Sequence, residues 1–148
     1  MVKALGKRLW LVAGTVIVTV AIVVLGVNFS SGEKKIERRI ERLAPYDLHW
    51  IEEPVRADDF EGIARIADEV ETPIQIGENF MGPEQMAQAL EARCCDFVMP
   101  DAQRIGGVTG WMRAAAIAGA AGIPVSTHLY PETAAHLMRV TETAHWLE

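Results

Sequence analysis

Acidic and histidine side chains end five strand-like runs of this sequence. The last residues of the runs are Glu52, Glu78, Asp101, His128 and Glu148. Successive end residues are 20 to 27 positions apart, and each interval contains one helical pattern. This is the spacing of successive βα units, whose parallel strands all end at one edge of the sheet. We therefore expect the five side chains to gather at that edge, where barrels of this kind carry their catalytic residues.

The expected neighbours have the chemistry to remove a proton next to a carboxylate. Glu52 and Glu78 end consecutive strands, and their oxygens suit a hard divalent cation such as Mg²⁺. Asp101 and His128 also end consecutive strands, and a carboxylate beside an imidazole orients the ring and raises its basicity. Glu148 would face both groups across a closed barrel. A metal that binds a substrate carboxylate, together with a base that takes the α-proton, would support this reaction.

The remaining histidines and tryptophans are interpreted as structural. His49 and His145 lie within strand-like runs and do not end them. Trp50, Trp111 and Trp146 are expected in the core, where large aromatic side chains are mostly buried.

Length and composition limit the function classes. The chain of 148 residues has the length of one domain, and a complete eight-unit barrel usually takes roughly 250 residues. A net charge of −6 and the absence of a basic, aromatic patch argue against a nucleic-acid partner. The two cysteines, Cys94 and Cys95, are adjacent, which favours a reducing compartment and a structural role over a disulfide or a metal site.

Five helical patterns alternate with the strand-like runs and predict an α/β fold of barrel type. The strand-like runs are Asp47–Glu52, Pro73–Glu78, Asp96–Asp101, Ile123–His128 and Ala144–Glu148. The helical patterns are Glu33–Leu43, Asp58–Val70, Gly82–Leu90, Thr109–Ala121 and Pro131–Val140. Asp58 or Asp59 can cap the second helix, and Gly122 should end the fourth.

An apolar N-terminal segment precedes these units. Residues 9–27 contain no charge, and lysines and arginines flank them on both sides. This pattern is typical of a membrane-spanning helix and weakly favours a cytoplasmic C-terminal domain anchored to the membrane. The alternative is that Ala21–Val27 forms a buried parallel strand. We therefore divide the chain into an apolar segment, residues 1–30, and a barrel domain, residues 31–148.

Several motifs together resemble the mandelate racemase group of the enolase superfamily, from about Ile36 to the last residue. The motifs are HWIEEP at 49–54, PIQIGEN at 73–79, VMPD at 98–101, RIGGVTGW at 104–111, S-x-H at 126–128 and TAHWLE at 143–148. The resemblance implies the C-terminal half of a TIM-type (β/α) barrel. It also implies Mg²⁺ as the cofactor and a small-molecule α-hydroxy carboxylate as the substrate. Family members of this kind are racemases (isomerases) and sugar-acid dehydratases (lyases) of hydroxy-acid catabolism.

The resemblance also implies a role for each matching residue. Glu52 and Glu78 resemble two of the three metal ligands of the family, and His128 and Asp101 resemble its base dyad. Glu148 resembles the acid that hydrogen-bonds the substrate carboxylate.

Two further positions resemble the substrate-binding residues of the family. They are Asn28 and Arg104, the latter a basic residue that the family places near the acid and the dyad.

The sequence departs from the family pattern at three points. The third metal ligand is the Asp of a D-x-N motif, and Gly26 stands in its place while Asn28 is retained. The K-x-K strand that carries an opposing base, and the capping domain, find no match. The alternative prediction is therefore a non-catalytic, truncated or fused half barrel, with tethering to a membrane and assembly into a homo-oligomer left open.

Overall fold

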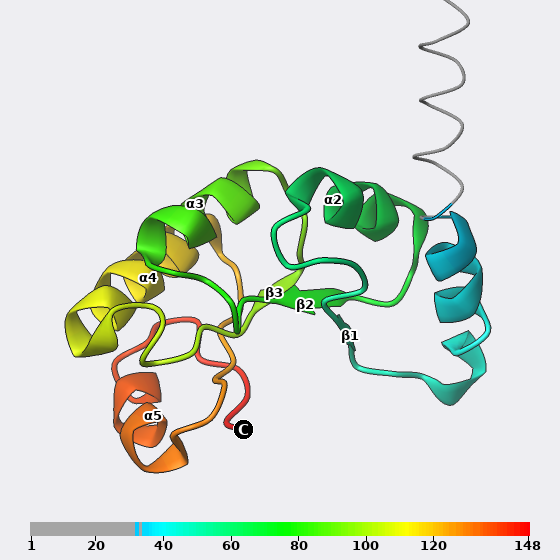
Figure 1. The fold of residues 1–148 in the computed structure, drawn as a ribbon. Helices are drawn as coiled ribbons and strands as arrows, with labels where there is room; N and C mark the ends of the chain where they lie inside the picture. Colours follow the sequence, from blue (N-terminus) through cyan, green and yellow to red (C-terminus); the bar gives the residue numbers. More distant parts are fainter. Residues whose placement is uncertain (1–31, 33) are drawn as a thin grey trace, which may run out of the picture. The chain divides into compact units, whose positions relative to one another are not determined.

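Helices alternate with short parallel strands along the described part of the chain. The computed structural model describes residue 32 and residues 34–148 (Figure 1). Its contacts separate Met1–Lys35 from a compact unit, Ile36–Glu148, which is described here by itself. Both interpretations of residues 9–27, the boundary at residue 30 and the place of Asn28 lie outside the described residues and stay predictions. Among the described helices, none has both the length and the apolar composition that crossing a bilayer requires.

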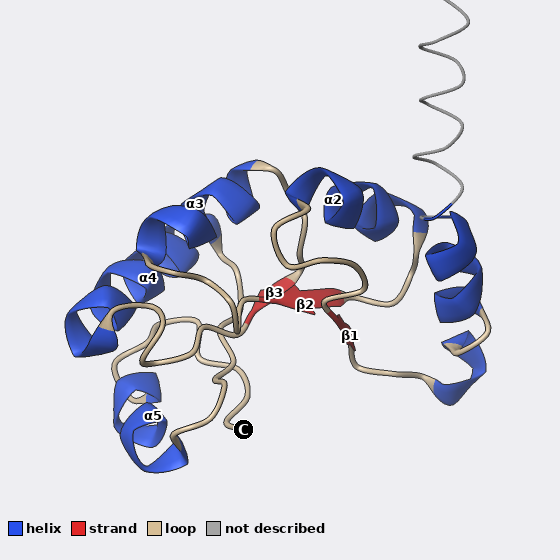
Figure 2. Ribbon diagram, in the orientation of Figure 1, coloured by secondary structure: helices blue, strands red, loops and turns tan. Residues whose placement is uncertain are grey.

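The strands form one parallel sheet, which confirms the predicted α/β class. Strands β1 (Ile51–Glu52), β2 (Ile74–Ile76) and β3 (Phe97–Val98) pair in that order (Figure 2). Parallel bridges from Val98 to Val125, and from Val125 to Ala144, extend the order to the last two runs. All five strand-like runs therefore pair in sequence order, although each regular strand is shorter than the predicted run.

The helices begin and end close to the predicted positions. They are residues 34–41, α2 (Phe60–Glu69), α3 (Pro83–Glu91), α4 (Gly107–Ala121) and α5 (Pro131–Met138), with a short 3-10 helix, η1 (Ala44–Tyr46). The carboxylate of Asp59 accepts the backbone N–H of Gly62 at 2.9 Å and caps α2, as predicted. Gly122 ends α4 in the left-handed conformation, which is also as predicted.

The core lies between the sheet and the helices. Ile74 and Ile76 are buried with Ile63 and Ile66 of α2 in one apolar cluster. Gln75, between the two isoleucines, must point to the opposite face of the strand. The sheet thus has one face covered by helices and a second face that carries polar and aromatic side chains.

The second face of the sheet carries an aromatic cluster. The rings of Phe97 and His145 have centroids 4.8 Å apart, and Trp50 packs edge-on against both Phe97 and Trp146. Trp111 is 1% exposed, as predicted for a core residue, whereas Trp146 is 51% exposed and its prediction was wrong. The strand-like run that contains Trp146 predicted a buried side chain. In the structure Trp146 lies with the aromatic cluster, on the sheet face that the described helices do not cover.

Candidate active site

The imidazole of His128 lies between two carboxylates. Its Nδ1 is 3.1 Å from Oδ2 of Asp101, and its Nε2 is 3.2 Å from Oε2 of Glu78. A parallel bridge between Asp101 and His128 sets the two backbones side by side, as the predicted strand ends require. The side chains of His128 and Asp101 are 15% and 4% exposed, and that of Glu78 is 35% exposed. The ring is therefore largely shielded from water, with Glu78 on its more open side.

The carboxylate of Asp101 is held on both oxygens. Its Oδ1 accepts the backbone N–H groups of Gln103 and Arg104 at 2.8 and 2.9 Å, while Oδ2 faces the imidazole. Burial alone would raise the pKa of Asp101, but the donors from Arg104, His128 and Gln103 outweigh it and hold the pKa below its usual value. Asp101 is therefore an ionised, fixed acceptor that orients the ring of His128.

This arrangement distinguishes the two nitrogens of His128. A neutral imidazole has one N–H donor and one acceptor, and an ionised carboxylate only accepts. Because Asp101 is the more buried and the better held of the two carboxylates, Nδ1 carries the donated hydrogen in the neutral ring. Nε2 is then the nitrogen that gains or loses the second proton, and in the protonated ring it donates to Oε2 of Glu78, 3.2 Å away.

A tight turn after β2 presents Glu78 and Asn79 at the sheet edge. The N–H of Phe80 donates to the carbonyl of Gly77 at 3.0 Å and closes the turn. Gly77 has a φ of 137°, and a Cβ there would lie 2.8 Å from the ring of Phe80 and 3.0 Å from the nitrogen of Met99. Only glycine fits this position, so the glycine of the GEN motif is needed to place Glu78.

Glu52 and Glu53 lie on different sides of the end of β1. Glu52 Oε1 accepts from Trp50 Nε1 at 2.8 Å and from Gln75 Nε2 at 3.0 Å, on the aromatic face. Glu53 instead accepts from the amide of Asn79 at 2.9 Å. Burial raises the pKa of Glu53, and the neighbouring carboxylates Glu78 and Glu52 raise it further against the hydrogen bond from Asn79.

The predicted metal ligands have the type of oxygen that Mg²⁺ prefers, but there are only two of them among the described residues. Glu52 and Glu78 provide hard carboxylate oxygens, and Mg²⁺ is commonly held by one or two carboxylates with water completing its shell. Within residues 34–148, no group of three or more histidine, cysteine, aspartate or glutamate side chains is arranged to hold a metal. Gly26, at the position of the third ligand, and Asn28 lie outside the described residues. Glu52 and Glu78 therefore suit the ion by their chemistry, and their assignment as a two-carboxylate site stays a prediction, because none of the described contacts joins the two side chains.

Glu148 and Arg104 contact different parts of the site, and the roles that the sequence predicts for them stay predictions. The N–H of Glu148 donates to Oγ1 of Thr127 at 2.9 Å, but none of the described contacts joins its exposed carboxylate to His128 or Asp101. Arg104 Nη1 donates to the Glu78 carbonyl at 3.0 Å and to Asn79 Oδ1 at 2.9 Å. Arg104 is thus beside the dyad, but its guanidinium contacts the turn that carries Glu78.

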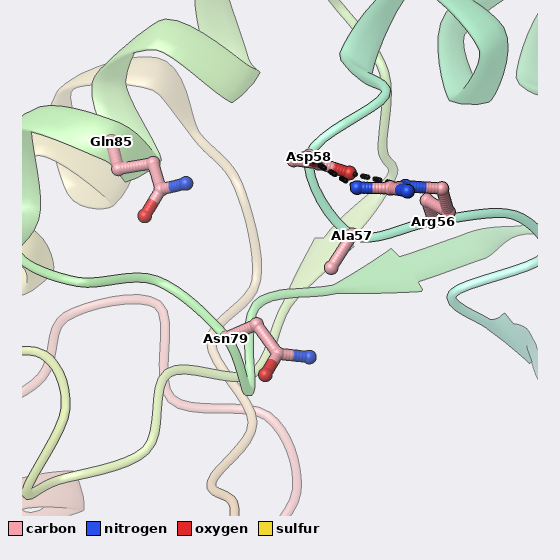
Figure 3. Close-up of a pocket in the computed structure, with 5 residues that line it drawn as sticks. All are labelled: Arg56, Ala57, Asp58, Asn79 and Gln85. Carbon is pink, nitrogen blue, oxygen red and sulfur yellow. Dashed lines mark hydrogen bonds and ion pairs between the residues drawn. The ribbon is translucent and has the colours of Figure 1, made fainter.

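A cavity of about 350 Å³ opens next to this turn. Figure 3 shows Asn79 at one side of it, Gln85 on α3 and the Arg56–Asp58 pair on the loop after β1; Ala57 completes the lining. Arg56 donates to both carboxylate oxygens of Asp58, at 3.0 and 2.9 Å. Asn79 is the residue that connects this cavity with Glu78, and the sequence patterns gave no signal for its role beyond its place in the GEN motif.

The chain is similar to known proteins in both sequence and fold. The family model described as "Enolase C-terminal domain-like" matches residues 24–148, a span that includes Gly26 and Asn28. The chain is 34% identical over 107 residues to L-talarate/galactarate dehydratase of Salmonella typhimurium, which covers 72% of this chain and 27% of that protein.

Solved structures give a similar result. A Bradyrhizobium enolase complexed with magnesium and mandelic acid is 49% identical, with a TM-score of 0.77, over 78% of this chain and 32% of that one. An enolase from alpha proteobacterium bal199 with bound magnesium is 59% identical, with a TM-score of 0.76, over the same shares of the two chains. This chain therefore spans about a third of the length of these relatives and forms part of a TIM-type barrel.

Proposed function

Because this chain belongs to the enolase C-terminal domain-like family, we propose that it supports Mg²⁺-dependent abstraction of the α-proton of an α-hydroxy carboxylate. The observation that supports the proposal is the imidazole of His128, which Asp101 fixes at Nδ1 and which faces Glu78 at Nε2, the nitrogen that would take the proton. The matched region is only 27% of the dehydratase and 32% of the Bradyrhizobium enolase, so the complete activity is part of the proposal.

In this reaction His128 is the base and Asp101 positions it. The electron pair of the C–H bond moves toward the substrate carboxylate as the proton passes to Nε2. The positive charge that forms on the ring is stabilised by the ionised Asp101, 3.1 Å from Nδ1. A Mg²⁺ ion held by Glu52 and Glu78 would stabilise the negative charge that develops on the substrate carboxylate. Asn28 and Glu148 are proposed to bind the substrate.

Two fates of the deprotonated substrate distinguish the candidate enzyme classes. Return of a proton to the other side of the α-carbon inverts its configuration, which is the isomerase reaction. Loss of the neighbouring β-hydroxyl group as water gives an enol that becomes a 2-keto-3-deoxy acid, which is the lyase reaction. Racemases and sugar-acid dehydratases both occur among the relatives, and both reactions begin with the step assigned to His128.

The proposal is tested by following the α-proton directly. The chain is incubated in D₂O with Mg²⁺ and, one at a time, galactarate, gluconate, galactonate, xylonate or mandelate. Proton NMR then reports loss of the α-proton signal, and semicarbazide reports any 2-keto product. Exchange or product formation with one of these acids, dependent on Mg²⁺, is the expected result.

A non-catalytic half barrel is the alternative, and two observations favour it. Gly26 offers no side chain at the position of the third ligand, and Trp146 of the aromatic cluster is 51% exposed in the described unit. Such a protein would leave every α-proton in place, with or without bound Mg²⁺. The same NMR experiment therefore separates the two functions.

A further inference from the structure

Asn79 bridges the carboxylates of Glu53 and Glu78, of which Glu78 contacts His128, although Asn79 is not among the residues that the sequence predicts for the site. Its Nδ2 donates to Glu78 Oε1 at 3.1 Å and to Glu53 Oε2 at 2.9 Å, and its Oδ1 accepts from Arg104 Nη1 at 2.9 Å. Arginine only donates and an ionised carboxylate only accepts, so these partners allow one orientation of the amide. Both hydrogens of Nδ2 are used, and the amide is fixed on three sides.

Arg104 connects to both carboxylates that flank the imidazole. Its backbone N–H donates to Asp101 Oδ1, and the other oxygen of Asp101 faces Nδ1 of His128. Its guanidinium donates to Asn79, the amide of Asn79 donates to Glu78, and Glu78 Oε2 faces Nε2 of His128. The same guanidinium holds the carbonyl of Glu78 at 3.0 Å. The two sides of the ring are thus tied together through one residue.

We propose that Asn79 and Arg104 are positioning residues that fix the carboxylate of Glu78, both against His128 and as a ligand for Mg²⁺. The proposal rests on the proposed function only in assigning Glu78 to the metal. Partners that hydrogen-bond a ligating carboxylate fix the direction of its lone pairs, and their loss typically weakens metal affinity about 10- to 100-fold. Arg104 acts on the substrate indirectly in this arrangement, because its guanidinium is bonded to the turn after β2.

The first test replaces Asn79 with leucine, which has nearly the same size and no hydrogen-bonding atom. Calorimetry measures the Mg²⁺ dissociation constant, which we expect to rise about 10- to 100-fold in Asn79→Leu. In the metal-free chain, ¹⁵N NMR at one pH measures the ring nitrogens of His128, assigned through His128→Asn. We expect the Nε2 resonance to move, because Glu78 is released, and the Nδ1 resonance to move less, because Asp101 still holds it.

Gln85→Leu is the matched control. Gln85 lines the same cavity (Figure 3), and its Oε1 accepts the N–H of Met81 at 2.8 Å, so the control removes an amide nearby without touching Glu78. We expect it to leave the Mg²⁺ affinity and both ring resonances unchanged. If Asn79→Leu does not fold, as judged by circular dichroism, Arg104→Met replaces it. Its side chain is exposed, and its loss frees Asn79 Oδ1, so a smaller change of the same kind is expected.

Each outcome decides the proposal. Unchanged Nε2 resonance in a folded Asn79→Leu chain overturns it, as does an equal change in Gln85→Leu. If the unsubstituted chain binds no Mg²⁺, the metal part of the proposed function fails, but the Nε2 resonance still reports whether Asn79 positions Glu78. If Mg²⁺ binds and Asn79→Leu changes neither the Mg²⁺ dissociation constant nor the Nε2 resonance, the proposal is overturned, because Glu78 then holds its position without Asn79.

Discussion

Oε2 of Glu78 lies 3.2 Å from Nε2 of His128, so a proposed metal ligand and the proposed base are direct neighbours. Glu78 follows β2 and His128 ends a later run, and the parallel order of the sheet brings them to one edge. The atom that would accept the α-proton therefore faces the group that would hold the metal. Substitution of either side chain should therefore change the immediate surroundings of the other, and that change should be measurable.

Replacement of Glu78 by glutamine should weaken Mg²⁺ binding. The carboxylate contributes a negative charge and hard oxygens, and the neutral amide keeps only one carbonyl oxygen for the metal. We expect saturable binding by the unsubstituted chain and a dissociation constant at least about 10-fold higher in Glu78→Gln, a size common for loss of a metal-site partner. Glu91→Gln, an exposed position at the end of α3, is the matched control. Equal affinities of all three chains would remove Glu78 from the metal site.

Replacement of Asp101 by asparagine should reduce the loss of folding stability that occurs as the pH falls. The pKa of Asp101 is lower in the folded chain than in the unfolded chain, because backbone and histidine donors outweigh the effect of its burial. The folded state therefore binds fewer protons, and the stability that Asp101 contributes is complete above its unfolded pKa of about 4 and is lost as the pH falls below that value. Urea unfolding at several pH values should show a smaller acid loss for Asp101→Asn than for the unsubstituted chain. Parallel pH profiles would contradict this.

Two glycines of α4 should respond to alanine with opposite signs. A Cβ on Gly110 would lie 1.9 Å from the carbonyl oxygen of Ile105, a backbone atom that cannot move aside. Gly110→Ala should therefore lower the free energy of unfolding by about 1–3 kcal/mol. On Gly119 the nearest atom is Oε2 of Glu142 at 3.2 Å, the flexible end of an exposed side chain. Gly119→Ala should thus be neutral or stabilising by about 0.5–1 kcal/mol. Urea unfolding at pH 7 measures both, and similar losses would contradict the assigned contacts.

The helices were predictable because local chemistry marks their ends. Asp59 caps α2 with its side chain, prolines occupy the first turns of α3 and α5, and Gly122 ends α4. These signals act within a few residues of each other. The bounds of the strands were less predictable, because a strand is defined by hydrogen bonds to its neighbours. Only Ile51–Glu52 of the predicted run Asp47–Glu52 pairs as a regular strand.

The site was predictable where it follows from strand order. Asp101 and His128 end neighbouring runs, so their contact follows from the βα spacing. Asn79 was not predictable, because its role depends on Glu53 and Arg104, which lie 26 and 25 positions away in the sequence, as well as on its neighbour Glu78. The exposure of Trp146 was missed for a related reason, since the sequence of a strand does not state which face another element covers.

The most direct test of the proposed function is hydrogen–deuterium exchange at the α-carbon, in D₂O with Mg²⁺, by the unsubstituted chain and by His128→Asn. Asparagine keeps a polar side chain of similar reach but has no basic nitrogen, so circular dichroism should show the same fold. We predict exchange, or conversion to a 2-keto acid, with at least one α-hydroxy acid of the panel. Loss of the base should lower its rate at least about 100-fold in His128→Asn. Exchange at equal rates in both chains, or no exchange with any acid of the panel, would contradict the assignment of His128 as the base.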